Sequence, residues 1–215
     1  MYEKRKIVAV FGGTFDPPHL GHLSMLDAAF SAGVVDKAVV VPAARPPHKA
    51  AEPAADFEDR LEMARLMGEG VSGKVAVSDI ESRLDSDGPT YTFETMAALE
   101  TEMPGVELRF LIGGDSLVAL HTWFKARGIV ERWGVVTVPR RGEGDGSEAT
   151  ERVLAENWSP EIASRLLESI LPCGMEDVSS SAVRRLLAEG KDASVFLQPA
   201  VSAYIKRKGL YKCRK

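Results

Sequence analysis

Cysteine is scarce in this chain of 215 residues, because only Cys173 and Cys213 occur, far apart and outside any CxxC spacing. This usage predicts neither a disulfide framework nor a thiolate zinc site, and it is typical of a reducing compartment, so we expect a cytoplasmic protein. The roughly 18 consecutive apolar residues that a membrane span needs are nowhere present. The first apolar stretch, Ile7 to Phe11, is too short for a signal segment, and we therefore expect no membrane partner.

An excess of basic charge is also missing, since 27 Lys and Arg stand against 31 Asp and Glu, a net charge of −4. Proteins that bind nucleic acid as their main partner usually carry a basic excess, so we expect no nucleic-acid partner. Any bound polyanion must be held by local basic groups. The length and the 45% hydrophobic content suit one domain over residues 1–215, with a helical C-terminal part over residues 170–215.

Short β-branched runs alternate with helical patterns along the chain. Near-continuous apolar strands between helices indicate a parallel sheet covered on both faces, so we predict an α/β fold with a doubly wound, mostly parallel sheet. Such sheets bind ligands beyond the carboxyl ends of their strands. Strands are predicted at Ile7–Phe11, Ala38–Val41, Lys74–Val77, Leu108–Ile112 and Val135–Val138, helices at Leu20–Ala32, Phe57–Met67, Tyr91–Glu100, Glu161–Ser169, Ser180–Ala188 and Pro199–Lys206, and surface loops at Pro42–Ala55 and Arg140–Thr150.

The segment FGGTFDPPHLGH, from Phe11 to His22, joins the first strand to the first helix. Gly12 and Gly13 lack a Cβ, which would allow a turn with positive φ and the close approach of another group. The helix that begins near Leu20 offers unpaired N–H groups and the positive end of its dipole, which favour an anion. Because GxxxxGK[ST] and GxGxxG are both missing, we predict a phosphate site of another type.

His19 and His22 stand three residues apart, so both rings can project from one side of the first helical turn. Imidazoles there can donate hydrogen bonds to phosphate oxygens or, when protonated, neutralise their charge. Gly21 leaves the surface between them without a side chain. Two surface histidines on a capped helix are the alternative, and no metal site is predicted because no other ligand stands at suitable spacing.

A second unusual segment is VSSSAVRRLLAEG, in which Ser179 or Ser180 is predicted to cap a helix that ends near Gly190. Arg184 and Arg185 lie close to the start of that helix, where the dipole disfavours positive charge. A bound anion would remove this conflict. The alternative is that both long side chains reach water.

The two segments resemble the signatures GGTFDPxHxGH and ISSTxIR of the HxGH nucleotidyltransferase superfamily, with Arg184 rather than Arg185 in the Arg position. The resemblance implies a Rossmann-like α/β/α sandwich and an adenylyl transfer from ATP, with Mg²⁺ accompanying the ATP. The ATP site that it implies comprises Gly12, Gly13, Thr14, Phe15, His19, His22, Gly113, Asp115, Ser179, Ser180 and Arg184.

Further segments resemble the bacterial nicotinate mononucleotide adenylyltransferases: RPPHK (45–49), GPTYTFETMAAL (88–99), IGGDS (112–116) and the ending LQPAVSAYIKRKGLY (197–211). The resemblance implies nicotinate mononucleotide as the acceptor, with Lys49 and its neighbour His48 approaching the triphosphate. The implied substrate-binding residues are Lys49, Tyr91, Thr92, Trp123 and Phe124, and the implied catalytic residues are His19, His22, Lys49 and Arg184.

The sequence departs from that family at three places on the pyridine side of the site. Arg141 replaces a proline, Gly114 replaces an alanine, and the stretch from Glu81 to Gly88 is longer than usual. These departures affect the expected substrate preference more than the expected adenylyl transfer.

Two alternatives stay open beside this interpretation. Phosphopantetheine adenylyltransferase has a segment like SSSAVR, but it usually carries Thr at the place of His19 and is shorter. A non-catalytic nucleotide sensor on the same fold would be expected to have lost some of the four implied catalytic residues, and all are present. The sequence is compatible with a homo-oligomer and does not predict one.

Overall fold

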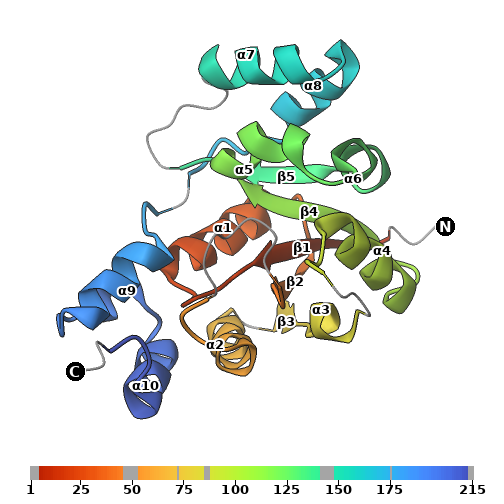
Figure 1. Ribbon diagram of the computed structural model, residues 1–215. Helices are drawn as coiled ribbons and strands as arrows, with labels where there is room; N and C mark the ends of the chain where they lie inside the picture. Colours follow the sequence, from red (N-terminus) through yellow and green to blue (C-terminus); the bar gives the residue numbers. More distant parts are fainter. Residues whose placement is uncertain are drawn as a thin grey trace.

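A computed structural model describes residues 5–45, 53–71, 73–84, 88–140, 148–174 and 176–212. Within these ranges, five parallel strands form one sheet in the order β3-β2-β1-β4-β5 (Figure 1). The order is that of a doubly wound sheet with β1 at its centre, as predicted. The strands are β1 (Ile7–Gly13), β2 (Lys37–Pro42), β3 (Val75–Val77), β4 (Glu107–Gly113) and β5 (Val135–Val138).

Alternate residues of each strand face two separate apolar cores, one on each side of the sheet. In β1, Ala9 and Phe11 lie in the core that includes α1, α2, α9 and α10, whereas Val8 and Val10 lie in the core that includes α4 to α8. Figure 1 shows these helices on opposite sides of the sheet. The near-continuous apolar strands of the sequence therefore reflect burial on both faces.

All five predicted strands are confirmed, and the six predicted helices are present with small shifts at their ends. The described helices are α1 (Leu20–Ser31), α2 (Phe57–Glu69), α3 (Ile80–Arg83), α4 (Thr92–Glu102), α5 (Gly114–Ala119), α6 (Ala126–Arg132), α7 (Glu148–Asn157), α8 (Pro160–Glu168), α9 (Ser180–Ala188) and α10 (Pro199–Lys208), with 3-10 turns η1 (Leu120–Thr122) and η2 (Ser194–Phe196).

Four helices were not predicted: α3, α5, α6 and α7. The first three have at most seven residues, too short for a clear helical period. The prediction of a loop over Arg140–Thr150 is wrong at its end, because α7 begins at Glu148. Leu154 is fully buried in α7, so tertiary packing of this side chain stabilises the helix. The sequence pattern alone was too weak to predict it.

The loop predicted at Pro42–Ala55 is also corrected at its described ends. A surface position was predicted for all of it, but Ala55 is buried among the residues that pack α2 against the sheet. Asp56 then caps α2 by accepting a hydrogen bond from the backbone N–H of Asp59 at 2.8 Å. The position of α2 thus fixes the end of this loop.

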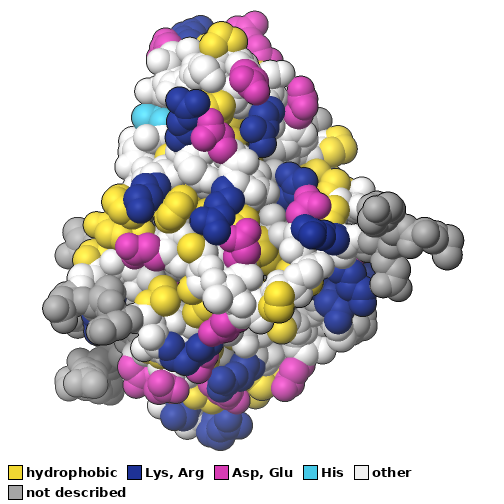
Figure 2. Space-filling model, turned by 90° about the vertical axis from the view of Figure 1, so that its right-hand side faces the viewer, with side chains coloured by type: hydrophobic (Ala, Val, Ile, Leu, Met, Phe, Trp, Pro, Cys, Tyr) yellow, Lys and Arg dark blue, Asp and Glu magenta, His cyan; other side chains and the backbone are white. Residues whose placement is uncertain are grey.

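Charged side chains of both signs alternate over the face shown in Figure 2. Exposed ion pairs among the described residues include Arg83–Glu102 and Arg127–Glu131. Among the described residues, the helices are all too short or too polar to cross a lipid bilayer.

Candidate active site

The turn after β1 places its unusual backbone conformation at Phe15 and not at the two glycines. Gly12 and Gly13 continue β1 and pair with Val41 and Pro42 of β2, whereas Phe15 has φ +51°. The expectation of positive φ at the glycines is therefore wrong. A left-handed non-glycine residue is rare and persists only where its surroundings hold it, which is common at functional sites.

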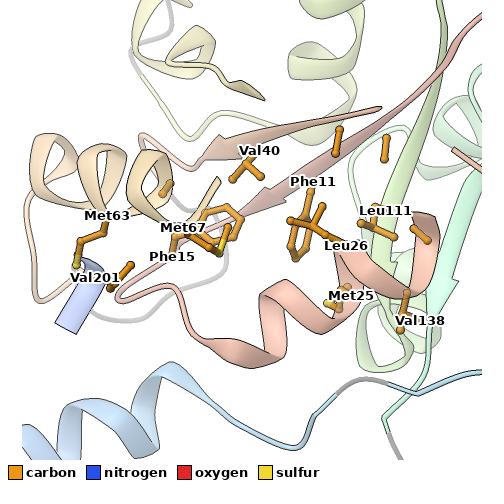
Figure 3. Packing of buried hydrophobic residues seen from close by; sticks show 14 of the residues in the cluster. Phe11, Phe15, Met25, Leu26, Val40, Met63, Met67, Leu111, Val138 and Val201 are labelled. Carbon is orange, nitrogen blue, oxygen red and sulfur yellow. The ribbon is translucent and has the colours of Figure 1, made fainter. Parts of the chain in front are cut away.

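Packing explains both Phe15 and Gly13. The Phe15 ring is fully buried and meets Phe11 edge to face, with ring centroids 5.4 Å apart. Figure 3 shows it beside Val40 and Met67, between the sheet and α2. A Cβ on Gly13 would lie 3.1 Å from the same ring, so glycine is needed there to admit Phe15.

His19 and His22 are brought together at the start of α1. Their ring centroids are 3.8 Å apart, and the ring of His22 also lies 4.9 Å from that of Phe15. The Nδ1 of His22 accepts a hydrogen bond from the backbone N–H of His19 at 3.1 Å. The proton of a neutral His22 ring is therefore on Nε2, which leaves Nε2–H as a donor toward a ligand.

Both imidazoles are neutral near pH 7. Burial, with the charge of Arg140 as a smaller cause, lowers the pKa of His19 to about 4. Burial, with His19 as a smaller cause, lowers the pKa of His22 well below 6.5. Of the two roles that the sequence allowed, hydrogen-bond donation fits this site and a permanent charge does not. The buried Nδ1 of His19 has no hydrogen-bond partner in the described part of the chain, which is uncommon for a buried polar atom.

The buried His19 should make folding stability depend on pH. Its pKa is lowered by folding, so the unfolded chain binds more protons below the ordinary value of 6.5, and stability is lost as the pH falls from there toward 4. Between about pH 7.5 and pH 5, the free energy of unfolding should fall by about 2 kcal/mol more for the wild type than for His19→Gln. Urea denaturation at both pH values measures this difference, and equal losses in the two proteins would contradict it.

Gly21 is needed for a more specific reason than an open surface. A Cβ there would lie 3.0 Å from the backbone carbonyl oxygen of Glu176 and from the ring of His19. The segment before α9 crosses the start of α1 at this point, and the backbone N–H of Glu176 donates to the hydroxyl of Ser24 at 2.9 Å. The glycine of the HxGH motif thus admits both the imidazole and the C-terminal segment.

Helix α9 docks its first turn on the loop that precedes α1 (Figure 1). Ser179 caps the helix by accepting from the backbone N–H of Ala182 at 3.2 Å, and the hydroxyl of Ser180 donates to the carbonyl of Pro17 at 2.9 Å. Arg184 donates to the carbonyl of Asp16 at 2.6 Å. Residues far apart in the sequence, from the start of the chain and from its last quarter, therefore meet beside the histidine pair.

Asp16 is a buried residue of this site that the sequence reasoning did not single out. Its carboxylate accepts backbone N–H groups of Ala54 and Ala55 and the hydroxyl of Tyr211, at 2.9, 3.1 and 2.9 Å. It also lies 3.6 Å from Nη1 of Arg184. Its position between Phe15 and His19 in the motif was the only available signal.

Two other buried charged residues hold the adjacent strand ends and were also missed. Arg60 donates to the carbonyls of Thr14 and Ala43, at 2.9 and 2.7 Å, and burial lowers its pKa. Glu81 accepts the backbone N–H of Ala44 at 3.1 Å, and burial raises its pKa. The loop over Pro42–Ala55 is thereby held at its start by side chains from α2 and α3.

Asp115, one of the residues implied for the ATP site, lies in the first turn of α5, two residues after β4 ends at Gly113. Its carboxylate is paired with Arg140 at 2.9 Å, and Arg140 also pairs with Asp177 at 2.6 Å, ahead of α9. Arg140 was not among the predicted site residues. Arg140 thus links the β4 side of the site to the α9 side. A Cβ added at Gly114 would lie 3.6 Å from the Cα of Pro139, which is an ordinary van der Waals contact.

Of the implied substrate-binding residues, Tyr91 and Phe124 are in contact, whereas Trp123 contacts Phe110 of β4. The rings of Tyr91 and Phe124 are 4.7 Å apart, and Trp123 meets Phe110 edge to face at 5.9 Å. Phe124 is 42% exposed, and the Nζ atom of Lys125 lies 5.0 Å from its ring centroid. Thr92 begins α4, so its backbone N–H has no acceptor within the helix.

Lys49 lies outside the described residues, so its predicted role stays a prediction. The same holds for Arg141. Among the other predicted residues, Gly13 and Gly113 end strands β1 and β4, and Thr92 begins α4. The roles of all these residues also stay predictions.

The fold and this arrangement define a nucleotidyltransferase class, and comparison with known proteins agrees. A family model described as cytidylyltransferase-like matches residues 10–186, from β1 into α9. The solved structure of Plasmodium falciparum nicotinic acid mononucleotide adenylyltransferase complexed with NaAD superposes with a TM-score of 0.70 at 19% identity, covering 96% of this chain and 98% of that one. That likeness confirms the Rossmann-like fold.

Comparison with curated relatives assigns the chain to one family within the nucleotidyltransferase class. One from Gloeobacter violaceus is 36% identical over 205 residues, covering 95% of both chains. One from Neisseria meningitidis serogroup B is 36% identical over 207 residues, covering 96% of this chain and 99% of its own. Both carry the name "Probable nicotinate-nucleotide adenylyltransferase". The chain belongs to the cytidylyltransferase-like family and, within it, to the nicotinate-nucleotide adenylyltransferases. The prediction of an adenylyltransferase is thereby confirmed.

Proposed function

We propose that the protein transfers the adenylyl group of ATP to nicotinate mononucleotide, giving nicotinate adenine dinucleotide and pyrophosphate. At the level of the site, one observation supports this proposal. The neutral His19–His22 pair and Arg184 lie around the same loop. Imidazole donors from the start of the chain and a cation from its last quarter are thus attached to the same loop, an arrangement that suits a polyphosphate.

The reaction is an in-line displacement at the α-phosphorus of ATP. An oxygen of the 5′-phosphate of nicotinate mononucleotide forms the new bond to phosphorus, and the bond to the bridging oxygen breaks with its electron pair leaving on pyrophosphate. Both reactants are anions, so orientation and charge stabilisation supply most of the rate. The Nε2–H of His22 donates to the α-phosphate, His19 assists at the neighbouring oxygens, and Arg184 with Lys49 holds the departing pyrophosphate.

The acceptor is held at the other end of the site. In this proposal its pyridine ring stacks on Trp123, beside the Tyr91–Phe124 pair. Backbone N–H groups of Thr92 and Phe124 receive the ring carboxylate, since the first residue of a helix leaves its N–H free for an anion. A carboxamide has only one oxygen, so its NH₂ group would face one of the two N–H donors. It is therefore the weaker ligand.

Mg²⁺ enters with ATP as part of the substrate, carried mainly by phosphate oxygens and water. Across the described ranges, His, Cys, Asp and Glu side chains do not gather in threes as a protein cage for an ion would require. The donors that are gathered here, imidazole N–H and guanidinium, suit phosphate oxygens and not a cation, which fits an ion held by the nucleotide.

One assay tests the proposal directly. Purified protein is incubated with Mg²⁺, ATP and either nicotinate mononucleotide or nicotinamide mononucleotide, with release of pyrophosphate followed and the dinucleotide identified by mass. We expect turnover with the acid to exceed turnover with the amide by at least about tenfold in kcat/KM, because the backbone donors pair fully only with a carboxylate. Equal turnover of the two acceptors would contradict the proposed recognition, and no dinucleotide with either would refute the function.

A further inference from the structure

The C-terminal end of the described chain reaches the loop of the histidine pair. After α10, the chain turns back through Gly209, with φ +67°, and Tyr211, with φ +63°. These two left-handed positions direct the Tyr211 hydroxyl to Oδ1 of Asp16, at 2.9 Å, across 195 residues of sequence. A left-handed tyrosine is costly, so the contacts of its side chain must hold it there.

The Asp16 carboxylate accepts three hydrogen bonds from two segments of the chain. Oδ1 receives Tyr211 and the backbone N–H of Ala55, and Oδ2 receives the backbone N–H of Ala54. The remaining neighbour of Oδ2 is Nη1 of Arg184, at 3.6 Å, which is an ion pair too long for a good hydrogen bond. Asp16 is only 1% exposed, so this geometry is shielded from water.

Arg184 is meanwhile held by its other contacts. Nη1 donates to the backbone carbonyl of Asp16 at 2.6 Å, and Nη2 to the hydroxyl of Ser181 at 3.2 Å. A full bidentate pair with the Asp16 carboxylate would occupy the guanidinium and oppose its use for phosphate. The contacts of Tyr211, Ala54 and Ala55 keep the carboxylate from turning to make that pair.

We propose that Tyr211 is a positioning residue: its hydrogen bond to Asp16 keeps the carboxylate turned away from Arg184, so that the guanidinium stays available to the triphosphate of ATP and to pyrophosphate. The inference rests on the proposed function for the role of Arg184. Burial raises the pKa of Tyr211, with the Asp16 carboxylate adding to it, so the hydroxyl remains a donor at any working pH. Without that hydroxyl, Oδ1 loses a partner and the carboxylate shifts toward Arg184.

The chain supplies a matched control. Tyr204, in α10, donates its hydroxyl to Oδ1 of Asp59 in α2 at 2.7 Å, a buried Tyr–Asp bond of the same chemistry that has no contact with Arg184. Tyr211→Phe and Tyr204→Phe each remove one oxygen atom from the C-terminal segment. Both variants are milder than Asp16→Asn, whose amide would face two backbone N–H groups and endanger folding.

The experiment compares the affinities of the two variants and the wild type for Mg²⁺-pyrophosphate by titration calorimetry, and KM for ATP and for nicotinate mononucleotide by kinetics. For Tyr211→Phe we expect pyrophosphate affinity to fall by about three- to tenfold, KM for ATP to rise to the same extent, and KM for the mononucleotide to stay unchanged. Tyr204→Phe should match the wild type in all three. Equal effects of the two variants, or none for Tyr211→Phe, would refute the positioning role. Since calorimetry needs no turnover, the inference is judged even if the proposed acceptor proves wrong.

Discussion

Replacing His22 with alanine should lower kcat by about 10²- to 10³-fold, because it removes a preorganised donor from the point where charge develops on the α-phosphate. The reason is specific to this geometry. The Nδ1 atom of His22 is engaged by the backbone of His19, and the neutral ring can therefore present only Nε2–H to a ligand. Steady-state kinetics with ATP and nicotinate mononucleotide, at saturating concentrations of both, measure the effect.

The control for loss of an imidazole is His121→Ala. His121 is exposed on η1, where its Nδ1 lies 3.0 Å from the carbonyl of Val118, and it has no part in the proposed chemistry. Its kcat should stay within about twofold of the wild type. Thermal unfolding of both variants separates a loss of catalysis from a loss of structure, because His22 packs between Phe15 and His19. A kcat close to normal in a folded His22→Ala protein would remove His22 from the mechanism.

The sheet was predictable from the sequence because its strands are short, β-branched and buried on both faces. Each of the five apolar runs could be assigned as a strand on its own. Their alternation with helices then predicted that the strands are parallel. The short helices were harder. Helix α6, for example, follows the N-cap residue Lys125, which has φ +51°, and it is held by packing of Ile129 and Val130, which a seven-residue pattern does not reveal.

The site was predictable in its parts but not in its connections. The motif indicated phosphate binding at His19 and His22, yet burial makes both rings neutral, and burial is a property of the fold and not of the pattern. The strained position fell on Phe15 instead of the glycines for the same reason, since it depends on the packing of the Phe15 ring beside Val40 of β2 and Met67 of α2. Asp16 has its role only because α9 and Tyr211 arrive from the far end of the chain.

Replacing Arg184 with alanine should lower kcat/KM for ATP by about 10²-fold, because the departing pyrophosphate would lose a charge-assisted donor in a partly buried place. Arg184→Lys should recover part of this loss, since an ammonium keeps the charge but cannot match the two-pronged contact of a guanidinium. Arg185→Ala is the matched control, because Arg185 is the next residue of α9 and is exposed. If Arg185→Ala lost as much activity as Arg184→Ala while both proteins unfolded at the wild-type temperature, the phosphates would be bound by the charge of the helix as a whole. The particular guanidinium that rests on Asp16 would then have no separate role.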